Sequence, residues 1–145
     1  MDAKEYDEQT VGNLLFKVLD PQAREEVMRL AQKQAFNPGD TIIQQGAPDE
    51  DIFLLRKGKV DVQTTQEGFI VELSTLEPGT IFGEVAEVRS VRRTATVVAK
   101  GEVEVLRFPG PELVEVLRRH ATASKLLDHI VLHRARDTIK KTFGD

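Results

Sequence analysis

The chain has 145 residues, of which 40% are hydrophobic, and 24 Asp and Glu residues outnumber 20 Lys and Arg residues. This length is enough for one domain with a core of its own, and the absence of cysteine excludes disulfide frameworks, cysteine-ligated zinc, iron–sulfur clusters and thiol nucleophiles. The net charge of -4 argues against nucleic acid as the main partner, and no apolar run reaches the roughly 18 residues of a membrane span, so we expect a cytoplasmic protein.

Helical spacing marks the N-terminal region, about residues 11–34. Apolar residues such as Leu14 and Val18 recur at steps of three and four residues, as on one face of a helix. Asp20 and Pro21 then interrupt this pattern. Because Asp is a favoured N-cap and Pro a favoured first helical residue, a second helix is predicted to begin there.

From about residue 36 to residue 108 the pattern becomes that of short antiparallel strands. Turn signals rich in Gly and Pro, such as those at residues 46–48 and 77–79, recur about every 7–12 residues. The segments between them are rich in β-branched and aromatic residues: 41–43, 52–55, 60–62, 69–71, 96–98 and 103–105. We therefore predict an α+β fold in which an antiparallel jelly-roll-like β-barrel is flanked by helices.

Helical periodicity returns over about residues 111–143. A short helix is followed by a longer one from about Ser124 to Phe143, whose apolar residues form one stripe. We expect these C-terminal helices to form a lid, and the sequence leaves open whether the stripe packs on the barrel, covers a ligand or pairs with a second chain. Because no linker is evident, residues 1–145 are predicted to form a single domain.

One segment, residues 79–97, breaks the strand rhythm and carries groups that suit a ligand site. Gly83 precedes a predicted helical turn at residues 84–88, where backbone N–H groups favour an anion. Arg93 supplies a guanidinium fork for a phosphate, and Glu84 can accept hydrogen bonds from a hydroxyl. A carboxylate, helix N-terminal amides and an arginine together suit a sugar phosphate.

Residues 82–97 resemble the phosphate-binding cassette of cyclic nucleotide-binding domains, the family of kinase regulatory subunits, cyclic nucleotide-gated channels and bacterial catabolite activators. They match its pattern of Phe-Gly-Glu-x-Ala, then an Arg and a small-Ala-Ser/Thr-Val ending, without a gap. The wider match includes Pro38-Gly39-Asp40 and Pro78-Gly79 and covers about residues 36–108. The resemblance implies a regulatory domain that binds cAMP or cGMP and couples binding to movement of its C-terminal helix.

The resemblance also implies roles for individual residues. Arg93 would pair with the cyclic phosphate, and Glu84 would accept the ribose 2′-hydroxyl. Thr94 resembles the threonine whose hydroxyl reaches the guanine 2-amino group in channels and cGMP-dependent kinases, which keeps both cAMP and cGMP open as ligands. Backbone amides of the cassette would complete the phosphate cradle. The ligand-binding residues that we expect are Phe82, Gly83, Glu84, Val85, Ala86, Arg93, Thr94 and Ala95.

Two positions depart from the family's pattern. Arg92 stands where many kinase-type members have proline, and Glu87 replaces the usual apolar residue after the cassette alanine. An inward-facing Glu87 would weaken phosphate binding, whereas on one helical turn it would equally face solvent. The alternative function is therefore a ligand-silent member of the fold that acts as a docking or dimerisation module, with a second copy or an effector domain contacting the C-terminal helix.

Other groups of polar residues have weaker claims to a site. His129, His133 and Asp137 are four residues apart along the last helix, a spacing that can chelate a metal, but a solvated polar face explains the same spacing and we expect no metal. The arginines of residues 89–93 have little aromatic interleaving, so direct nucleic-acid binding is not expected. The strands lack a convergent nucleophile–base pair, which argues against catalysis.

Overall fold

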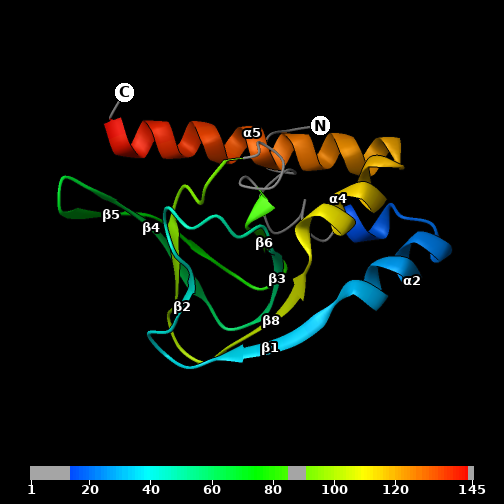
Figure 1. Cartoon of the computed structure of the whole chain (residues 1–145), viewed down its shortest axis with the longest axis horizontal. Helices are drawn as coiled ribbons and strands as arrows, with labels where there is room; N and C mark the ends of the chain where they lie inside the picture. Colours follow the sequence, from blue (N-terminus) through cyan, green and yellow to red (C-terminus); the bar gives the residue numbers. More distant parts are fainter. Residues whose placement is uncertain (1–13, 85–90, 144–145) are drawn as a thin grey trace.

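Two antiparallel four-stranded sheets face each other in the computed structural model of this chain, which describes residues 14–84 and 91–143, with side-chain surroundings up to residue 133 (Figure 1). The first sheet has the strand order β1 (Gln32–Phe36), β8 (Val103–Phe108), β3 (Ile52–Lys57) and β6 (Ile81–Phe82). The second has the order β2 (Thr41–Ile43), β7 (Thr96–Ala99), β4 (Val60–Gln66) and β5 (Phe69–Leu76). This arrangement confirms the predicted jelly-roll-like barrel within an α+β fold.

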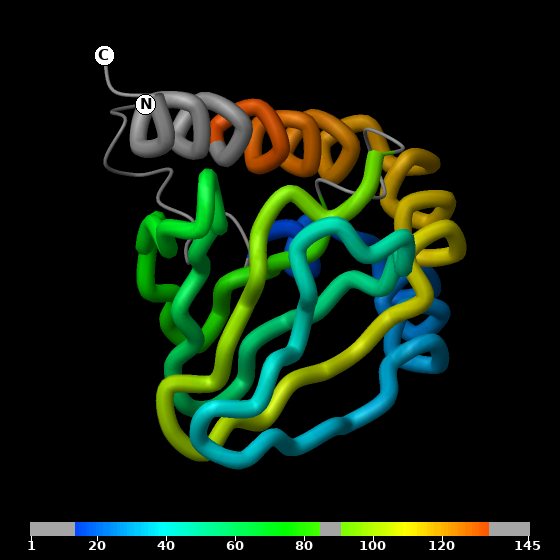
Figure 2. The backbone as a smooth tube through the Cα atoms, turned by 60° about the vertical axis from the view of Figure 1, so that its left-hand side comes forward, coloured from blue at the N-terminus to red at the C-terminus, as the bar shows by residue number. Residues whose placement is uncertain are grey.

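Helices cover the first sheet and one end of the barrel. Residues 14–17 are helical and are followed by α2 (Pro21–Leu30), while α4 (Gly110–Arg118) and α5 (Ala121–Phe143) come after the last strand. As predicted, Asp20 is the N-cap of α2, because its carboxylate accepts a 2.8 Å hydrogen bond from the backbone N–H of Ala23. Figures 1 and 2 both show α5 lying across the end of the barrel. None of the helices in the described part of the chain is long and apolar enough to span a membrane.

Buried apolar side chains form one cluster on each face of the first sheet. Strand β3 shows the division: Ile52 and Leu54 pack against the helices, whereas Phe53 and Leu55 point into the barrel. A strand that is buried on both faces carries a continuous apolar run instead of an alternating pattern. The second cluster fills the barrel interior and includes Val60, Phe82, Val97, Ala99 and Val105.

Some boundaries differ from those expected from the sequence. Helix α2 ends at Leu30, not near residue 34, and Gln32–Phe36 forms β1, which pairs with β8. Because β1 lies at the edge of its sheet and none of its residues is buried, its sequence lacks the apolar alternation of an inner strand. The long C-terminal helix begins at Ala121, three residues before the expected Ser124.

Candidate ligand-binding site

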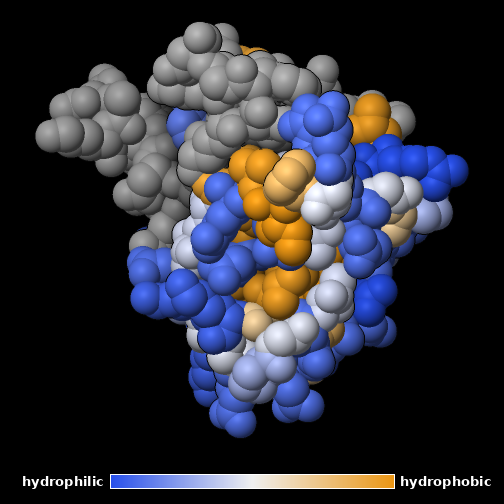
Figure 3. Space-filling view, turned by 90° about the vertical axis from the view of Figure 1, so that its left-hand side faces the viewer, coloured by the Kyte–Doolittle hydropathy of each residue, from blue (hydrophilic) through white to orange (hydrophobic). Residues whose placement is uncertain are grey.

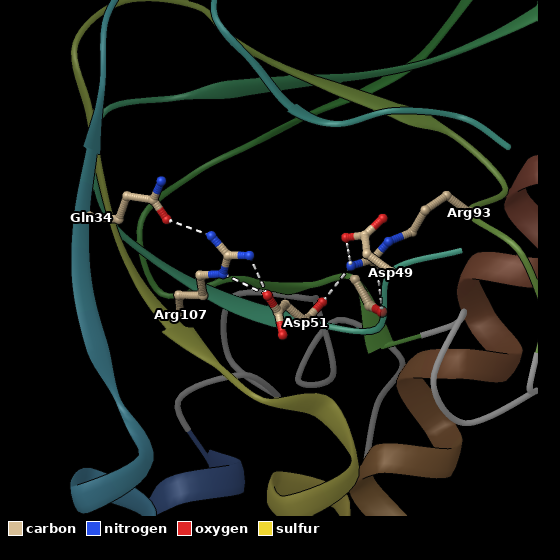
Figure 4. Close-up of polar contacts among 6 residues, drawn as sticks. Gln34, Asp49, Asp51, Arg93 and Arg107 are labelled. Atoms are coloured by element: carbon tan, nitrogen blue, oxygen red, sulfur yellow. Dashed lines mark hydrogen bonds and ion pairs between the residues drawn. The ribbon is translucent and has the colours of Figure 1, made fainter. Parts of the chain in front are cut away.

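The side chain of Arg93 is buried where three backbone segments meet (Figure 4). Only 2% of this side chain is exposed. Its Nη1 donates to the carbonyl oxygen of Gly83 at 2.8 Å, and its Nη2 donates to the carbonyl oxygen of Asp51 at 2.7 Å and to Oδ2 of Asp49 at 2.8 Å. Its Nε is also buried, and no residue that the structure describes accepts a hydrogen bond from it. The guanidinium is therefore fixed in direction while its Nε–H has no acceptor among the described residues.

Asp49 is the carboxylate partner of this arginine and lies closer to solvent. Its side chain is 45% exposed, against 2% for Arg93. The hydrogen bond from Arg93 is the main cause that holds the pKa of Asp49 below the ordinary value, although partial burial opposes this shift. Asp49 is thus an anion at neutral pH that accepts a hydrogen bond from Nη2 of the guanidinium.

The backbone of Arg93 is tied to the turn that follows β2. Its N–H donates to the carbonyl oxygen of Ala47 at 2.9 Å, and its carbonyl oxygen accepts from the N–H of Gly46 at 2.8 Å. The neighbouring Arg92 instead has an exposed side chain, whose Nη1 donates to the carbonyl oxygen of Gly46 at 3.2 Å. Two successive arginines therefore have opposite orientations, and Arg93 is the one that enters the protein.

Gly83 follows β6 in a conformation that requires glycine. Its φ is 93°, in the left-handed region that L side chains rarely adopt. A Cβ at this position would lie 2.7 Å from the carbonyl oxygen of Asp51 and 3.0 Å from Nη1 of Arg93. The absence of a side chain therefore allows Arg93 to approach both backbone carbonyls.

A second ion pair fixes the loop that leads into β3. Nε of Arg107 donates to Oδ2 of Asp51 at 2.6 Å, and Nη2 of the same arginine also contacts that oxygen. Nη1 of Arg107 donates to Oε1 of Gln34 at 3.2 Å, and its guanidinium lies 5.8 Å from the centre of the Phe53 ring. Since the backbone oxygen of Asp51 accepts from Arg93, this pair helps to orient Arg93.

The structure brings several of the expected site residues together. Glu84 follows Gly83 and is fully buried, while Thr94 is exposed and Ala95 is partly buried. The ring of Phe82 lies inside the barrel, stacked on Phe53 at a centroid distance of 5.1 Å, so its side chain is part of the core. The expected Val85 and Ala86 lie outside the described residues, as does Glu87.

A sequence profile described as Cyclic nucleotide-binding domain matches residues 33–120, more than half of the chain. The chain belongs to this family. The match includes both sheets and the whole of the candidate site.

Known relatives of this cyclic nucleotide-binding domain are channels and kinase subunits. It is 33% identical over 116 residues to cyclic nucleotide-gated channel beta-3 of Mus musculus, a match that covers 78% of this chain and 17% of the channel. It is 31% identical over 111 residues to the cAMP-dependent protein kinase regulatory subunit of Schizosaccharomyces pombe, covering 68% of this chain and 27% of that protein. The domain therefore matches only a minor part of each relative's length.

Solved structures share the fold. The catabolite activator protein of Thermus thermophilus superposes with a TM-score of 0.73 at 26% identity, covering 86% of this chain and 59% of that chain. The regulatory domain of Toxoplasma gondii PKA, crystallised with cAMP, superposes with a TM-score of 0.72 at 18% identity, covering 92% of this chain and 49% of that chain.

The histidines of α5 lie on its exposed face. The rings of His129 and His133 stack at a centroid distance of 6.4 Å. Within the described ranges, no three His, Cys, Asp or Glu side chains are grouped so that they could hold a metal ion. The side chain of Asp137, the third residue of the metal hypothesis, lies outside the described residues.

Asp49, Asp51 and Arg107 belong to the site but were missed by sequence reasoning. Asp49 lies 44 positions from Arg93, and Asp51 lies 56 positions from Arg107, so local spacing does not reveal either pair. A usable signal was the acidic run at residues 49–51, directly before a buried strand, because carboxylates beside a core need cationic partners.

Proposed function

We propose that this domain binds a purine 3′,5′-cyclic nucleotide, cAMP or cGMP, as a regulatory ligand around Arg93. One observation carries the proposal: the guanidinium is 2% exposed, yet its Nε lacks an acceptor among the described residues. Buried cations and buried donors normally have partners, so an unused donor on a buried arginine favours an anionic ligand with several acceptor oxygens. A cyclic phosphate is such a ligand, and a guanidinium fork suits its geometry.

The remaining cassette residues receive roles in the same proposal. Glu84, buried directly after Gly83, accepts the ribose 2′-hydroxyl. The backbone amides of Val85, Ala86 and Ala95 complete the phosphate cradle, and Thr94 contacts the base when guanine is bound. In this proposal the ligand contacts residues that directly follow β6 and residues that directly precede β7.

Calorimetric titration with cAMP and cGMP tests this proposal in the wild type, Arg93→Leu and Arg92→Leu. Loss of one partner of a desolvated charge pair typically costs 2–5 kcal/mol, so Arg93→Leu should bind roughly 30-fold to several thousand-fold more weakly. Arg92→Leu is the matched control, because its side chain is exposed and hydrogen-bonds the carbonyl oxygen of Gly46, and it should bind as the wild type does. Equal affinity in the wild type and Arg93→Leu would contradict the proposed site.

The buried Arg93 also has a structural role, so its variants need a folding control. Arg93→Leu removes hydrogen bonds to two backbone carbonyls, and a thermal scan of each ligand-free variant shows whether it folds. Arg93→Lys keeps the charge but loses the planar fork, so its affinity should fall between those of the wild type and Arg93→Leu. This series keeps the test valid even where the leucine variant unfolds.

A docking module without a ligand is the second candidate, and two observations favour it. Asp49 already neutralises Arg93, and Phe69 and Ile70 of β5 are 74% and 66% exposed. Figure 3 shows apolar surface gathered in the middle of the face that is turned toward the viewer, with hydrophilic surface around it. Absence of heat and of thermal stabilisation with either nucleotide at millimolar concentration would favour this candidate.

The proposed regulatory output is a movement of α5. This helix packs against α4 and β5 and lies across the end of the barrel (Figure 1). Its first half is anchored by buried apolar side chains, including Leu127, Ile130 and Val131. A ligand that binds one position of α5 better than another shifts the helix toward that position.

A further inference from the structure

Thr64 of β4 carries a buried hydroxyl that the fold does not use. The residue is 5% exposed, and its Oγ1 finds no hydrogen-bond partner among the residues that the structure describes. Buried hydroxyls are almost always hydrogen-bonded, and a valine would fill the same space without the unmet polar atom. The hydroxyl therefore suits a partner that is not part of the chain.

The alternation of β4 directs this hydroxyl into the barrel. Val60 and Val62 precede Thr64 on the same face of the strand, and both pack in the cluster that fills the barrel interior. Thr65 points the opposite way and is exposed. The side chain of Gln45 bonds the backbone of Thr65 on both sides, accepting from its N–H at 2.8 Å and donating to its carbonyl oxygen at 3.3 Å.

The same contacts bring this part of β4 close to Arg93. Gln63, the residue before Thr64, pairs with Thr96 of the neighbouring strand β7. Thr96 in turn lies three residues after Arg93 in the chain. Gln45 lies between the two segments, because its N–H donates to Oγ1 of Thr96 at 3.0 Å and the following N–H donates to the carbonyl oxygen of Arg93. Among the described residues, only Thr64 and Arg93 have a buried side-chain nitrogen or oxygen without a partner. The two unused polar atoms thus lie on segments that are joined through Gln45 and Thr96.

We propose that the hydroxyl of Thr64 hydrogen-bonds the 6-substituent of the ligand's purine base while Arg93 holds the phosphate. This inference rests on the proposed function. Two neighbours of Thr64 are apolar: Val71 lies opposite it on β5, and Val62 precedes it on the same face of β4. Apolar neighbours of this kind suit the flat face of a base, and the hydroxyl is then available to its polar edge.

The chemistry of a hydroxyl suits the 6-position in particular. Adenine carries an amino donor there and guanine an oxygen acceptor, and a hydroxyl can accept from the first or donate to the second. Thr64 therefore stabilises either purine without choosing between them. It selects against a purine with no 6-substituent, because the buried hydroxyl then stays unpaired.

Calorimetry on Thr64→Val and Thr64→Ser, with Thr65→Val as the matched control, tests this inference. The probes are cAMP and its 6-unsubstituted analogue, purine riboside 3′,5′-cyclic monophosphate. We expect Thr64→Val to bind cAMP about three- to ten-fold more weakly, the size of one hydrogen bond, and to bind the analogue as well as the wild type does. Thr64→Ser and Thr65→Val should bind cAMP normally.

Stability separates a ligand contact from a packing role. Ligand-free Thr64→Val should unfold at the same or a higher temperature than the wild type, since it loses an unpaired buried hydroxyl. Unchanged cAMP affinity in Thr64→Val, or an equal loss for both probes, would overturn the inference while leaving ligand binding intact. A wild type that binds neither probe would instead refute the proposed function itself.

Discussion

At the scale of single residues, Asp49 bonds the same guanidinium that the proposed ligand would use. Its carboxylate accepts a 2.8 Å hydrogen bond from Nη2 of that arginine. A phosphate that reaches the same guanidinium brings a second negative charge beside Asp49. The carboxylate must therefore move outward or tolerate a like charge, and its 45% exposure leaves room for an outward movement.

Asp49→Asn should consequently bind cAMP or cGMP more tightly than the wild type. A like charge at about 4 Å in a water-like dielectric opposes binding by about 1 kcal/mol, so a gain of roughly five-fold is expected. Glu50→Gln is the matched control, because it removes the same charge from the neighbouring, exposed residue. Weaker binding by Asp49→Asn in a calorimetric titration would show that Asp49 instead serves to orient Arg93 for the ligand.

The pH dependence of stability gives a second readout of the same pair. Arg93 lowers the pKa of Asp49 in the folded state, so protons favour the unfolded chain. The stabilisation is complete above the ordinary aspartate pKa of about 3.9 and is lost as the pH falls through the lower folded-state value. The difference in unfolding free energy between the wild type and Asp49→Asn should therefore shrink on acidification from neutral pH, as denaturant titrations at several pH values would measure.

At the scale of elements, the end of β6 determines where Arg93 can lie. This strand has two residues, and it pairs with β3 through Phe53↔Phe82 and Leu54↔Ile81. Gly83 then turns the chain so that its carbonyl oxygen meets Nη1 of Arg93. A short strand and a left-handed glycine together carry the chain from the barrel core into the site.

Gly83→Ala should both destabilise the protein and weaken ligand binding. A left-handed non-glycine residue costs about 1–3 kcal/mol, and the new Cβ would lie 2.7 Å from a backbone oxygen, which has little freedom to move. Gly101→Ala is the control, since its Cβ would meet nothing within 4 Å. Urea denaturation measures the first effect and calorimetry the second. Equal stability of the two variants would contradict the structural role of Gly83.

The sequence revealed elements with a strong local signal and missed those defined by pairing. The buried run of β3 and the Asp20–Pro21 helix start were predicted, because apolar content and capping chemistry are local. Strand β1 was assigned to a helix, since no buried residue marks it, and the two-residue β6 was too short to recognise. The cassette was found through its resemblance to a family.

The acidic half of the site shows the same limit. The role of Asp49 and Asp51 depends on their partners, Arg93 and Arg107. Arg93 lies just before β7 and Arg107 lies in β8, and only the fold brings them beside the two aspartates. Likewise, Thr64 resembles any other polar residue of a half-buried strand until its burial, and its lack of a partner within the described part of the chain, are known. Ion pairs between residues far apart in the chain, and the hydrogen bonding of buried side chains, are known only once the chain is folded.

At the scale of the whole molecule, ion pairs connect the helices at one end of the barrel. Arg119 after α4 pairs with Glu26 of α2 at 2.8 Å, and Arg118 pairs with Asp128 of α5 at 2.8 Å. Arg118 also donates to the side chain of Ser124 in the first turns of α5. These contacts anchor the start of α5, so a ligand-driven movement should increase along the helix away from α4.

A distance measurement between α5 and the barrel tests this movement. The chain has no cysteine, so Lys100→Cys and Leu132→Cys introduce two nitroxide labels without further changes. Lys100 is exposed beside β7, and Leu132 is 50% exposed on α5. Pulsed electron resonance should show a changed distribution of label distances with saturating cAMP or cGMP, because the ligand shifts the population of helix positions only by its differential affinity for them.

The Arg93→Leu background supplies the control for that experiment. A ligand that acts through the phosphate site should leave the label distances of this variant unchanged at a concentration that shifts the otherwise wild-type protein. A ten-fold preference for one helix position changes the ratio of the two populations ten-fold, which is well within the range of the method. If calorimetry shows binding but the distances do not change, the ligand has no preference between positions of α5, and the regulatory output must lie in another part of the domain.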